Sequence, residues 1–304
     1  MKAMRANLLL LLTAMIWGVA FVAQSVGGDL IPPFTFLALR SWLGALALLP
    51  LVLWRGRGGA YRPRMKPTLL TGLVCGSILF LASAAQQYGM TLDASPATAG
   101  FLTTLYVPLV PLLALLVFRE SVRWNVWCSI VLAVIGLALL SGLGTGFGPG
   151  EWVLLLCALL YAIHILVIDR FSDRTDPVLL SQVQFIVCAA VSTVMALLFD
   201  ETSMEAILQA RWAILYTGLL SSGVGYTLQV VAQRDTSPTI ASLLMSFESV
   251  FACLSGWLIL GDRPAPIKLA GCGLMFCAVL LAQAPPAKKP LQASADAASR
   301  SDSR

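Results

Sequence analysis

The chain has 304 residues, of which 58% are hydrophobic and 12% charged, with a formal net charge of +5. Soluble domains are roughly 45–50% apolar and about 25% charged, so a water-soluble core cannot absorb this excess of apolar side chains. The charges are also unevenly spread and leave apolar runs of about 18–24 residues, each long enough to cross about 30 Å of hydrocarbon as a helix. The composition therefore excludes a soluble fold and predicts a membrane protein.

The apolar runs predict an all-α polytopic membrane protein with ten transmembrane helices. Backbone groups in lipid must be satisfied within their own element, and the runs lack the alternation of barrel strands. The first run follows Lys2 and Arg5 as in a signal peptide, but it has no convincing small-residue cleavage site, so we interpret it as a retained helix. The tail at 285–304, rich in Ala, Ser and charge, is expected to be disordered and cytoplasmic. In chain order the predicted spans are 6–26, 33–54, 68–88, 95–117, 124–142, 151–170, 178–198, 211–232, 237–260 and 266–284.

The distribution of Lys and Arg predicts the orientation. If the N-terminus is cytoplasmic, sixteen basic residues fall in inside segments, and only Arg211, Arg263 and Lys268 fall in outside ones. Both termini are therefore expected in the cytoplasm. The short soluble segments and the lack of any Asn-x-Ser/Thr sequon suit a bacterial inner (plasma) membrane. Because the basic residues flank the membrane without interleaved aromatic residues, no binding of nucleic acid is expected.

An internal repeat relates the two halves of the chain. A shift of 142 residues aligns Asp-Ala-Ser-Pro at 93–96 with Asp-Thr-Ser-Pro at 235–238, and Glu120 with Asp262. Ser before Pro at a helix start is an N-cap followed by a residue whose missing N–H costs nothing. Since each repeat contains five helices, an odd number, the second copy must enter the membrane from the opposite side. We therefore predict two inverted five-helix repeats, 1–142 and 143–284, an architecture that recurs in secondary transporters.

Several of these segments also carry a family resemblance. Ala-Met-Ile-Trp-Gly at 14–18, Phe-Leu-Ala-Leu-Arg at 36–40 and the two Ser-Pro-led helices resemble the EamA family of the drug/metabolite transporter (DMT) superfamily. The resemblance covers about residues 8–284. It implies export or uptake of small organic solutes, such as amino acids, nucleosides or amphipathic compounds, through a cavity between the repeats.

Ionisable side chains inside predicted helices are candidates for function, because a charge at the bilayer centre costs several kcal/mol and needs a partner or a water-filled cavity. Glu248 lies about 15 Å into its helix, near the midplane, and is the first candidate for a substrate or proton site. Its counterpart in the repeat is Tyr106, which can face the same cavity. Arg40 can reach a midplane carboxylate or serve as a fixed charge for anionic solutes, and a structural anchor is equally open. His164, the single histidine, can titrate near neutral pH or be an ordinary hydrogen-bonded core residue.

Four further residues complete the set of substrate-binding or coupling candidates. Trp17 can stack on an amphipathic solute, although aromatic residues in helices usually pack. The second repeat has Tyr161 where the first has Trp17, so the two halves need not bind alike. Gln87 and its counterpart Gln229 either line the cavity or join helices by hydrogen bonds.

The function indicated is a secondary transporter that exports small metabolites or amphipathic solutes by alternating access, with proton coupling as a further option. No catalytic residue, metal site or cofactor is expected: His164 and Asp169, five apart on one helix, point about 140° away from each other, and other catalytic motifs are missing. A channel, an assembly factor or an intramembrane enzyme is the alternative. The expected partners are a small-molecule solute and the lipid bilayer, with a homodimer left open.

Overall fold

The computed structural model describes residues 2–57, 64–92, 96–141, 148–261 and 263–284, and every element within these ranges is helical. The predicted disordered tail therefore lies outside the described residues. In the first half the elements are α1 (Lys2–Gly28), α2 (Pro33–Arg57), α3 (Met65–Thr91), α4 (Pro96–Thr104), α5 (Tyr106–Phe118) and α6 (Trp124–Ser141). In the second half they are α7 (Pro149–Phe171), η1 (Ser172–Arg174), α8 (Pro177–Phe199), α9 (Met204–Gln209), α10 (Arg211–Leu215), η2 (Tyr216–Gly225), α11 (Tyr226–Ala232), α12 (Pro238–Met245), α13 (Glu248–Ser255), η3 (Gly256–Leu260) and α14 (Pro266–Gln283).

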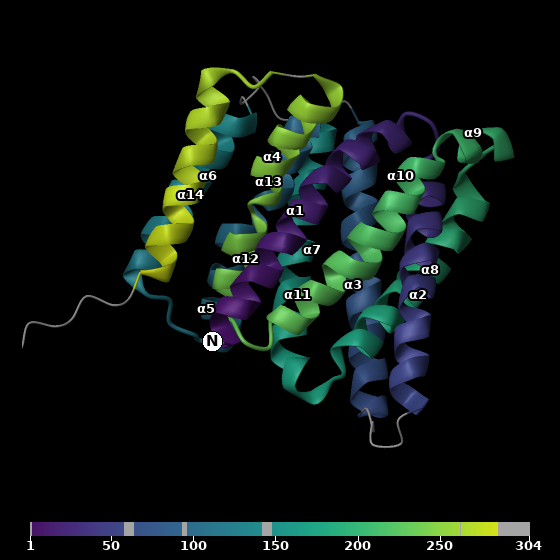
Figure 1. Cartoon of the computed structure of the whole chain (residues 1–304), viewed down its shortest axis with the longest axis horizontal. Helices are drawn as coiled ribbons and strands as arrows, with labels where there is room; N and C mark the ends of the chain where they lie inside the picture. The colour runs from purple at the N-terminus through teal and green to yellow at the C-terminus, as the bar shows by residue number, and fades with distance from the viewer. Residues whose placement is uncertain (1, 58–63, 93–95, 142–147, 262, 285–304) are drawn as a thin grey trace, which may run out of the picture.

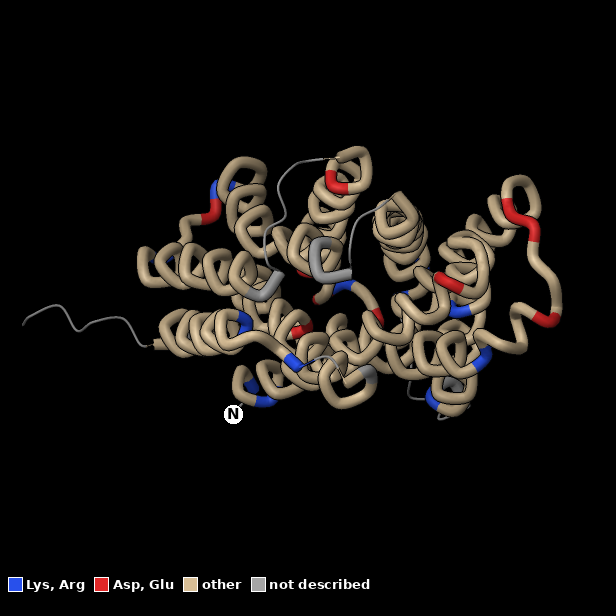
Figure 2. The backbone as a smooth tube through the Cα atoms, turned by 90° about the horizontal axis from the view of Figure 1, so that it is seen from above, with Lys and Arg blue, Asp and Glu red and all other residues tan. Residues whose placement is uncertain are grey.

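The helices have the length and composition of membrane spans. Within the described ranges, eight are long and apolar enough to cross a bilayer, and two shorter apolar helices cover Trp124–Leu139 and Pro266–Ala282. Seen from above, the bundle consists almost entirely of uncharged residues (Figure 2). The predicted all-α membrane class is thereby confirmed, whereas the number of ten crossings stays a prediction.

Pairs of helices organise the bundle (Figure 1). At one side α6 packs along α14, and at the other side α2 packs along α8, while α1 runs between them against α13, η2 and α11. The contact between α2 and α8 is fixed near one end by Asp200, whose Oδ2 accepts hydrogen bonds from the Thr35 backbone N–H at 2.6 Å and its hydroxyl at 2.9 Å. Helices distant in sequence thus enclose the centre of the molecule.

Helix starts follow the sequence chemistry. Proline occupies the first position of α2, α4, α7, α8, α12 and α14, where its missing N–H leaves no helical bond unmade. The predicted cap is confirmed at Ser237, which has extended backbone angles and whose side chain accepts a hydrogen bond from the Ile240 N–H. Its counterpart in the first repeat, Ser95, lies outside the described residues.

Three predicted spans are not single regular α-helices, which corrects the sequence interpretation. The span 95–117 is broken at Leu105, between α4 and α5, and the span 237–260 is broken at Ser246 and Phe247, between α12 and α13. Pro108 contributes to the first break because it has no N–H to donate to the carbonyl four residues earlier. The span 211–232 is continuous, but it is wound as a π-helix over η2 rather than as a regular α-helix.

Two helices end in left-handed residues 142 positions apart. Arg119 closes α5 with φ = 57°, and Gly261 closes η3 with φ = 79°. A side chain at positive φ is strained by roughly 1–2 kcal/mol relative to the right-handed region, whereas glycine is not. We expect Arg119→Gly to raise the free energy of unfolding by about 0.5–1 kcal/mol, measured by thermal unfolding in detergent. A lower melting temperature would contradict the interpretation that Arg119 is strained at its positive φ.

Candidate functional site

The centre of the bundle holds a cavity lined by both halves of the chain. Its volume is about 40 Å³, room for a few water molecules at roughly 10–15 Å³ each. Binding sites for whole metabolites usually span about 300–1,000 Å³, so the cavity in this structure is too small to hold a whole metabolite. The lining residues are Trp17, Ala20, Phe21, Gln24, Arg40, Gln86, Thr103, Tyr106, Tyr161, Ser221, Tyr226 and Glu248.

One face of α1 supplies a wall of this cavity. Trp17, Ala20, Phe21 and Gln24 follow the spacing i, i+3, i+4, i+7, which places them on the same side of a helix. Trp17 was a predicted site residue, and the helical period from it leads directly to Gln24. That period was the signal by which sequence reasoning could have found Gln24.

Glu248 lies at the start of α13, directly after the break that separates it from α12. Its side chain is 4% exposed, and its Oε1 accepts hydrogen bonds from the Tyr106 hydroxyl at 3.1 Å and the Thr104 hydroxyl at 3.5 Å. The Thr104 hydroxyl also lies 3.1 Å from the Ser249 hydroxyl. Tyr106 and Thr104 flank the break between α4 and α5, so the two helix breaks meet around one carboxyl group. The two predicted site residues Glu248 and Tyr106 therefore touch.

Arg40 faces the same cavity from α2 but does not pair with Glu248. Its Nη1 donates a hydrogen bond to Gln24 Oε1 at 2.6 Å, and its guanidinium carbon lies 5.9 Å from the centre of the Phe36 ring. Both Arg40 and Gln24 are buried. The single ion pair between described residues joins Arg55 and Asp176, far along α2 from Arg40.

Aromatic side chains close the cavity on the side of the second half. The rings of Trp17 and Tyr226 lie 4.6 Å apart between centroids, and the Trp17 Nε1–H points to the Ser221 carbonyl at 3.4 Å. Tyr161, the predicted counterpart of Trp17, exchanges a 3.1 Å hydrogen bond with the Ser83 hydroxyl and also lines the cavity. The wall offers flat apolar faces with hydroxyl groups at their edges, which suits an amphipathic solute.

Three predicted site residues are buried elsewhere. His164 is 1% exposed and shares a 3.0 Å hydrogen bond with Gln184 Oε1, behind the ring of Tyr226. Gln87 and Gln229 are buried outside the cavity lining, and the structure gives their side-chain oxygens no hydrogen-bond partner among the described residues. Besides Gln24, the lining residues outside the predicted set are Ala20, Phe21, Gln86, Thr103, Ser221 and Tyr226.

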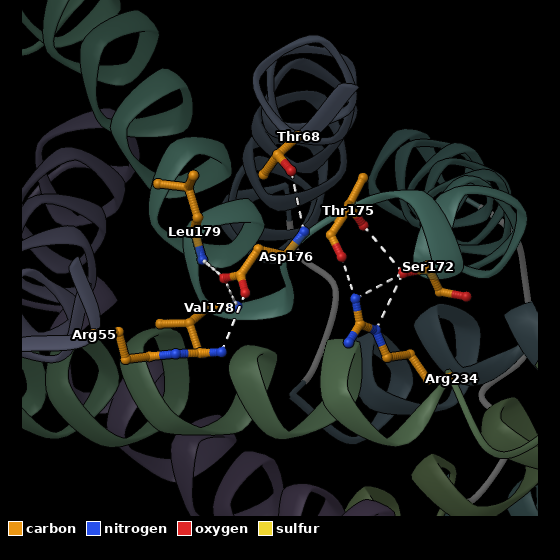
Figure 3. A network of polar contacts seen from close by, with 8 residues as sticks. All are labelled: Arg55, Thr68, Ser172, Thr175, Asp176, Val178, Leu179 and Arg234. Carbon is orange, nitrogen blue, oxygen red and sulfur yellow. Dashed lines mark hydrogen bonds and ion pairs between the residues drawn. The ribbon is translucent and has the colours of Figure 1, made fainter. Parts of the chain in front are cut away.

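A polar network joins the two halves at the lower end of the bundle in Figure 1, where α2 ends and α8 begins. Arg55 Nη2 lies 3.3 Å from Asp176 Oδ2, and the Asp176 backbone N–H donates to the Thr68 hydroxyl at 3.1 Å (Figure 3). The other carboxylate oxygen caps α8 by accepting from the N–H groups of Val178 and Leu179. This set of contacts, which we name the lower latch, ties the end of α2 and the start of α3 to the start of α8.

Arg234 extends this network within the second half. Its guanidinium donates to the backbone carbonyls of Ser172 and Thr175, which lie just before Asp176 (Figure 3). Beside it opens a polar pocket of about 450 Å³ whose lining includes Asp169, Asp173 and Asp235. No group of three or more potential metal ligands lies together within the described ranges.

Apolar helices that form a bundle, with two interrupted helices that meet at a buried polar cavity, are typical of membrane transporters. The chain belongs to the EamA-like transporter family, whose sequence profile matches residues 4–142 and again residues 148–283. The resemblance noted from the sequence is thereby confirmed.

Several relatives of the chain are themselves named as transporters or exporters. An uncharacterized transporter of Archaeoglobus fulgidus is 30% identical over 92% of this chain and 86% of its own. The threonine/homoserine exporter RhtA of Escherichia coli is 28% identical over 89% and 88%, and an S-adenosylmethionine uptake transporter of Rickettsia prowazekii is 25% identical over 83% of each chain. A solved crystal structure has the same fold, with a TM-score of 0.77, 20% identity, and coverage of 91% of this chain and 96% of the other.

Proposed function

We propose that this EamA-family transporter is a secondary carrier that exports small metabolites or amphipathic solutes by alternating access, coupled to protons through Glu248. The observation that carries the proposal is the meeting of both helix breaks at Glu248, which lines the central cavity. Broken helices near the midplane are where secondary carriers bind solutes and coupling ions. A carboxyl group there can exchange a proton with the solute path, as intramembrane acidic residues do in other carriers.

The proposed architecture is ten helices in two inverted repeats, 1–142 and 143–284, with both termini cytoplasmic in a bacterial inner membrane. Contacts between equivalent positions support it. Tyr106 and Glu248, 142 residues apart, hydrogen-bond to each other, as residues beside a pseudo-two-fold axis would. The breaks at Leu105 and Phe247 have the same separation. The pairs α2 with α8 and α6 with α14 also join equivalent helices.

The direction and the solute are further parts of the proposal. The named relatives include one exporter, of threonine and homoserine, and one uptake transporter, of S-adenosylmethionine, so the family supports both directions. The exporter is the more similar of the two, at 28% identity against 25%, and export is accordingly the direction that we propose. All three solutes in these names, threonine, homoserine and S-adenosylmethionine, are small polar metabolites.

The test is transport by purified protein in liposomes. Amino acids, nucleosides, sugars and amphipathic cations are first screened for a thermal shift, and each stabilising solute is then measured for flux driven by a pH gradient. We expect at least one solute to show saturable flux that reverses with the gradient. A linear dependence of flux on concentration would indicate a channel. A well-folded protein that neither binds nor moves any solute would favour an assembly factor or another role without transport.

Alternating access requires the lower latch to open and close. Asp176→Asn keeps an oxygen that caps α8 but removes the ion pair with Arg55. A partly exposed ion pair contributes about 1 kcal/mol or less, so we expect up to roughly a fivefold shift toward the form open at this end. The measurement is the rate at which a thiol reagent added from that side labels a cysteine introduced by Ala20→Cys.

Arg55→Gln provides the second half of a double-mutant cycle for the latch. If the pair closes the cavity, Arg55→Gln and Asp176→Asn each raise the labelling rate and the double variant raises it no further. Independent, additive effects of the two substitutions would show that the pair does not act as one latch.

A further inference from the structure

Arg40 is a buried cation whose hydrogen-bonding capacity is only partly used by the described residues. The guanidinium group carries five N–H donors, and the side chain is 7% exposed and lines the central cavity. Among the residues that the structure describes, Gln24 is its one hydrogen-bond acceptor, through Nη1. The remaining donors are therefore left for whatever enters the cavity.

Among the described residues, no carboxylate forms an ion pair with Arg40. Gln24 fixes the guanidinium with a neutral amide oxygen, and the Phe36 ring lies 5.9 Å from its central carbon. Glu248, the one carboxyl group among the described lining residues, is engaged by Tyr106 and Thr104 instead. A buried cation without an anionic partner is costly, so an anionic group on the solute would relieve a cost that the empty site carries.

We propose that Arg40 forms an anion subsite that binds a carboxylate group of the transported solute, with Gln24 as the residue that positions the guanidinium. This inference rests on the proposed transport function and names the chemistry that the solute must carry. The planar fork of an arginine matches the two oxygens of a carboxylate. Because Arg40 is the single Lys or Arg among the described residues that line the cavity, a monoanion matches its charge better than a phosphate dianion.

The neighbouring groups extend the recognition beyond the carboxylate. The paired rings of Trp17 and Tyr226 offer an apolar face for a side chain, and Glu248 offers an acceptor for an ammonium group in the same cavity. A solute with a carboxylate at Arg40 and an amine toward Glu248 uses both charges. The carboxylate is the required part, because Glu248 already accepts two hydrogen bonds, whereas Arg40 has one neutral acceptor and no anionic partner among the described residues.

The experiment uses matched solutes that differ only in their charged groups. Phenylalanine is compared with 3-phenylpropionate, phenethylamine and 2-phenylethyl phosphate, and threonine with 3-hydroxybutyrate and 1-amino-2-propanol. Leucine, 4-methylpentanoate and isopentylamine form a third series. Thermal shift and liposome flux are measured for each solute with the full-length wild-type protein. We expect binding and flux only for members that carry a carboxylate.

Two substitutions then assign the effect to the subsite. Arg40→Gln removes the cation, and loss of hydrogen bonds to a charged group should weaken carboxylate binding by about tenfold to a hundredfold. Gln24→Glu keeps the arginine but places a carboxylate where the amide oxygen now lies, so it should neutralise the subsite and give a loss of the same order. Arg211→Gln, in an exposed helix start away from the cavity, is the matched control and should leave binding unchanged.

The outcomes separate this inference from the transport function. Transport of amines without carboxylates, or equal affinity of Arg40→Gln and wild type for the carboxylate solutes, would overturn the subsite while leaving a carrier in place. A preference for 2-phenylethyl phosphate over 3-phenylpropionate would overturn the choice of a carboxylate. Absence of binding and flux for every solute in a monodisperse protein would count against the transport function and the subsite together. If the Gln24→Glu variant bound carboxylate solutes as tightly as the wild type, the proposal that Gln24 positions the guanidinium would be wrong.

Discussion

Glu248→Gln is expected to reduce flux driven by a pH gradient to the rate of protein-free liposomes. The amide keeps the size of the side chain and an oxygen that can accept from the Tyr106 and Thr104 hydroxyls, so the packing of the two helix breaks is preserved. A side-chain amide does not change its protonation state near neutral pH, so the variant cannot carry a proton and the coupling step is lost. The measurement is uptake into liposomes with an imposed pH gradient, using a solute found in the thermal-shift screen.

Solute exchange without a gradient provides the control for this variant. If Glu248 serves proton coupling alone, Glu248→Gln still binds the solute and exchanges it between the two sides at equal pH. Tyr106→Phe should retain gradient-driven flux in part, because it removes one donor to the carboxyl group and leaves the proton-carrying group in place. Unchanged gradient-driven flux in a normally folded Glu248→Gln protein would contradict a role in coupling.

Gly18→Ala is expected to lower the free energy of unfolding by about 1–3 kcal/mol or more, as overpacking of a tight interface does. A Cβ atom at Gly18 would lie 2.4 Å from the Phe251 Cβ, 2.7 Å from the Glu248 carbonyl oxygen and 2.8 Å from the Ala252 nitrogen. Two of these are backbone atoms of α13, which cannot move aside without shifting the helix that carries Glu248. The loss is measured as a fall in melting temperature and in transport rate.

Gly273→Ala is the matched control for this substitution. Gly273 is exposed on α14, and a Cβ atom there would meet nothing within 4 Å. Alanine has the higher helix propensity, so the change should be neutral or stabilising by up to about 1 kcal/mol. If both alanine variants proved equally stable, the close approach of α1 and α13 would not be the constraint that the geometry indicates.

The positions of the helices could be predicted from the sequence because lipid imposes a simple rule. A run of apolar residues must satisfy its backbone groups internally, so length and hydropathy alone locate a span such as α2 or α8 to within a few residues. The internal winding was not predictable in this way. Pro108 gives a reason for the break before Tyr106, but the equivalent break before Glu248 contains no proline and depends on tertiary contacts.

The candidate site could be predicted in part, because charged side chains carry a large free-energy cost in lipid and so draw attention to themselves in an apolar helix. Glu248 and Arg40 are costly in lipid, so each marks the cavity, and the repeat spacing led from Glu248 to Tyr106. Gln87, Gln229 and His164 are also costly to place in lipid, yet they lie outside the cavity lining. The polarity of a residue therefore does not predict which face of its helix lines the cavity. The partner of Arg40 depends on how α1 and α2 approach each other in space.

The most direct test of alternating access is to label one cavity position from both sides of the membrane. Ala20 is 1% exposed in the cavity wall, and Ala20→Cys in a variant without the seven native cysteines places one small thiol there. A membrane-impermeant methanethiosulfonate reagent is added to right-side-out and inside-out vesicles, with and without a solute that binds. Alternating access predicts labelling from both sides, with the solute changing both rates. Labelling from one side only, under every solute and pH condition, would contradict it.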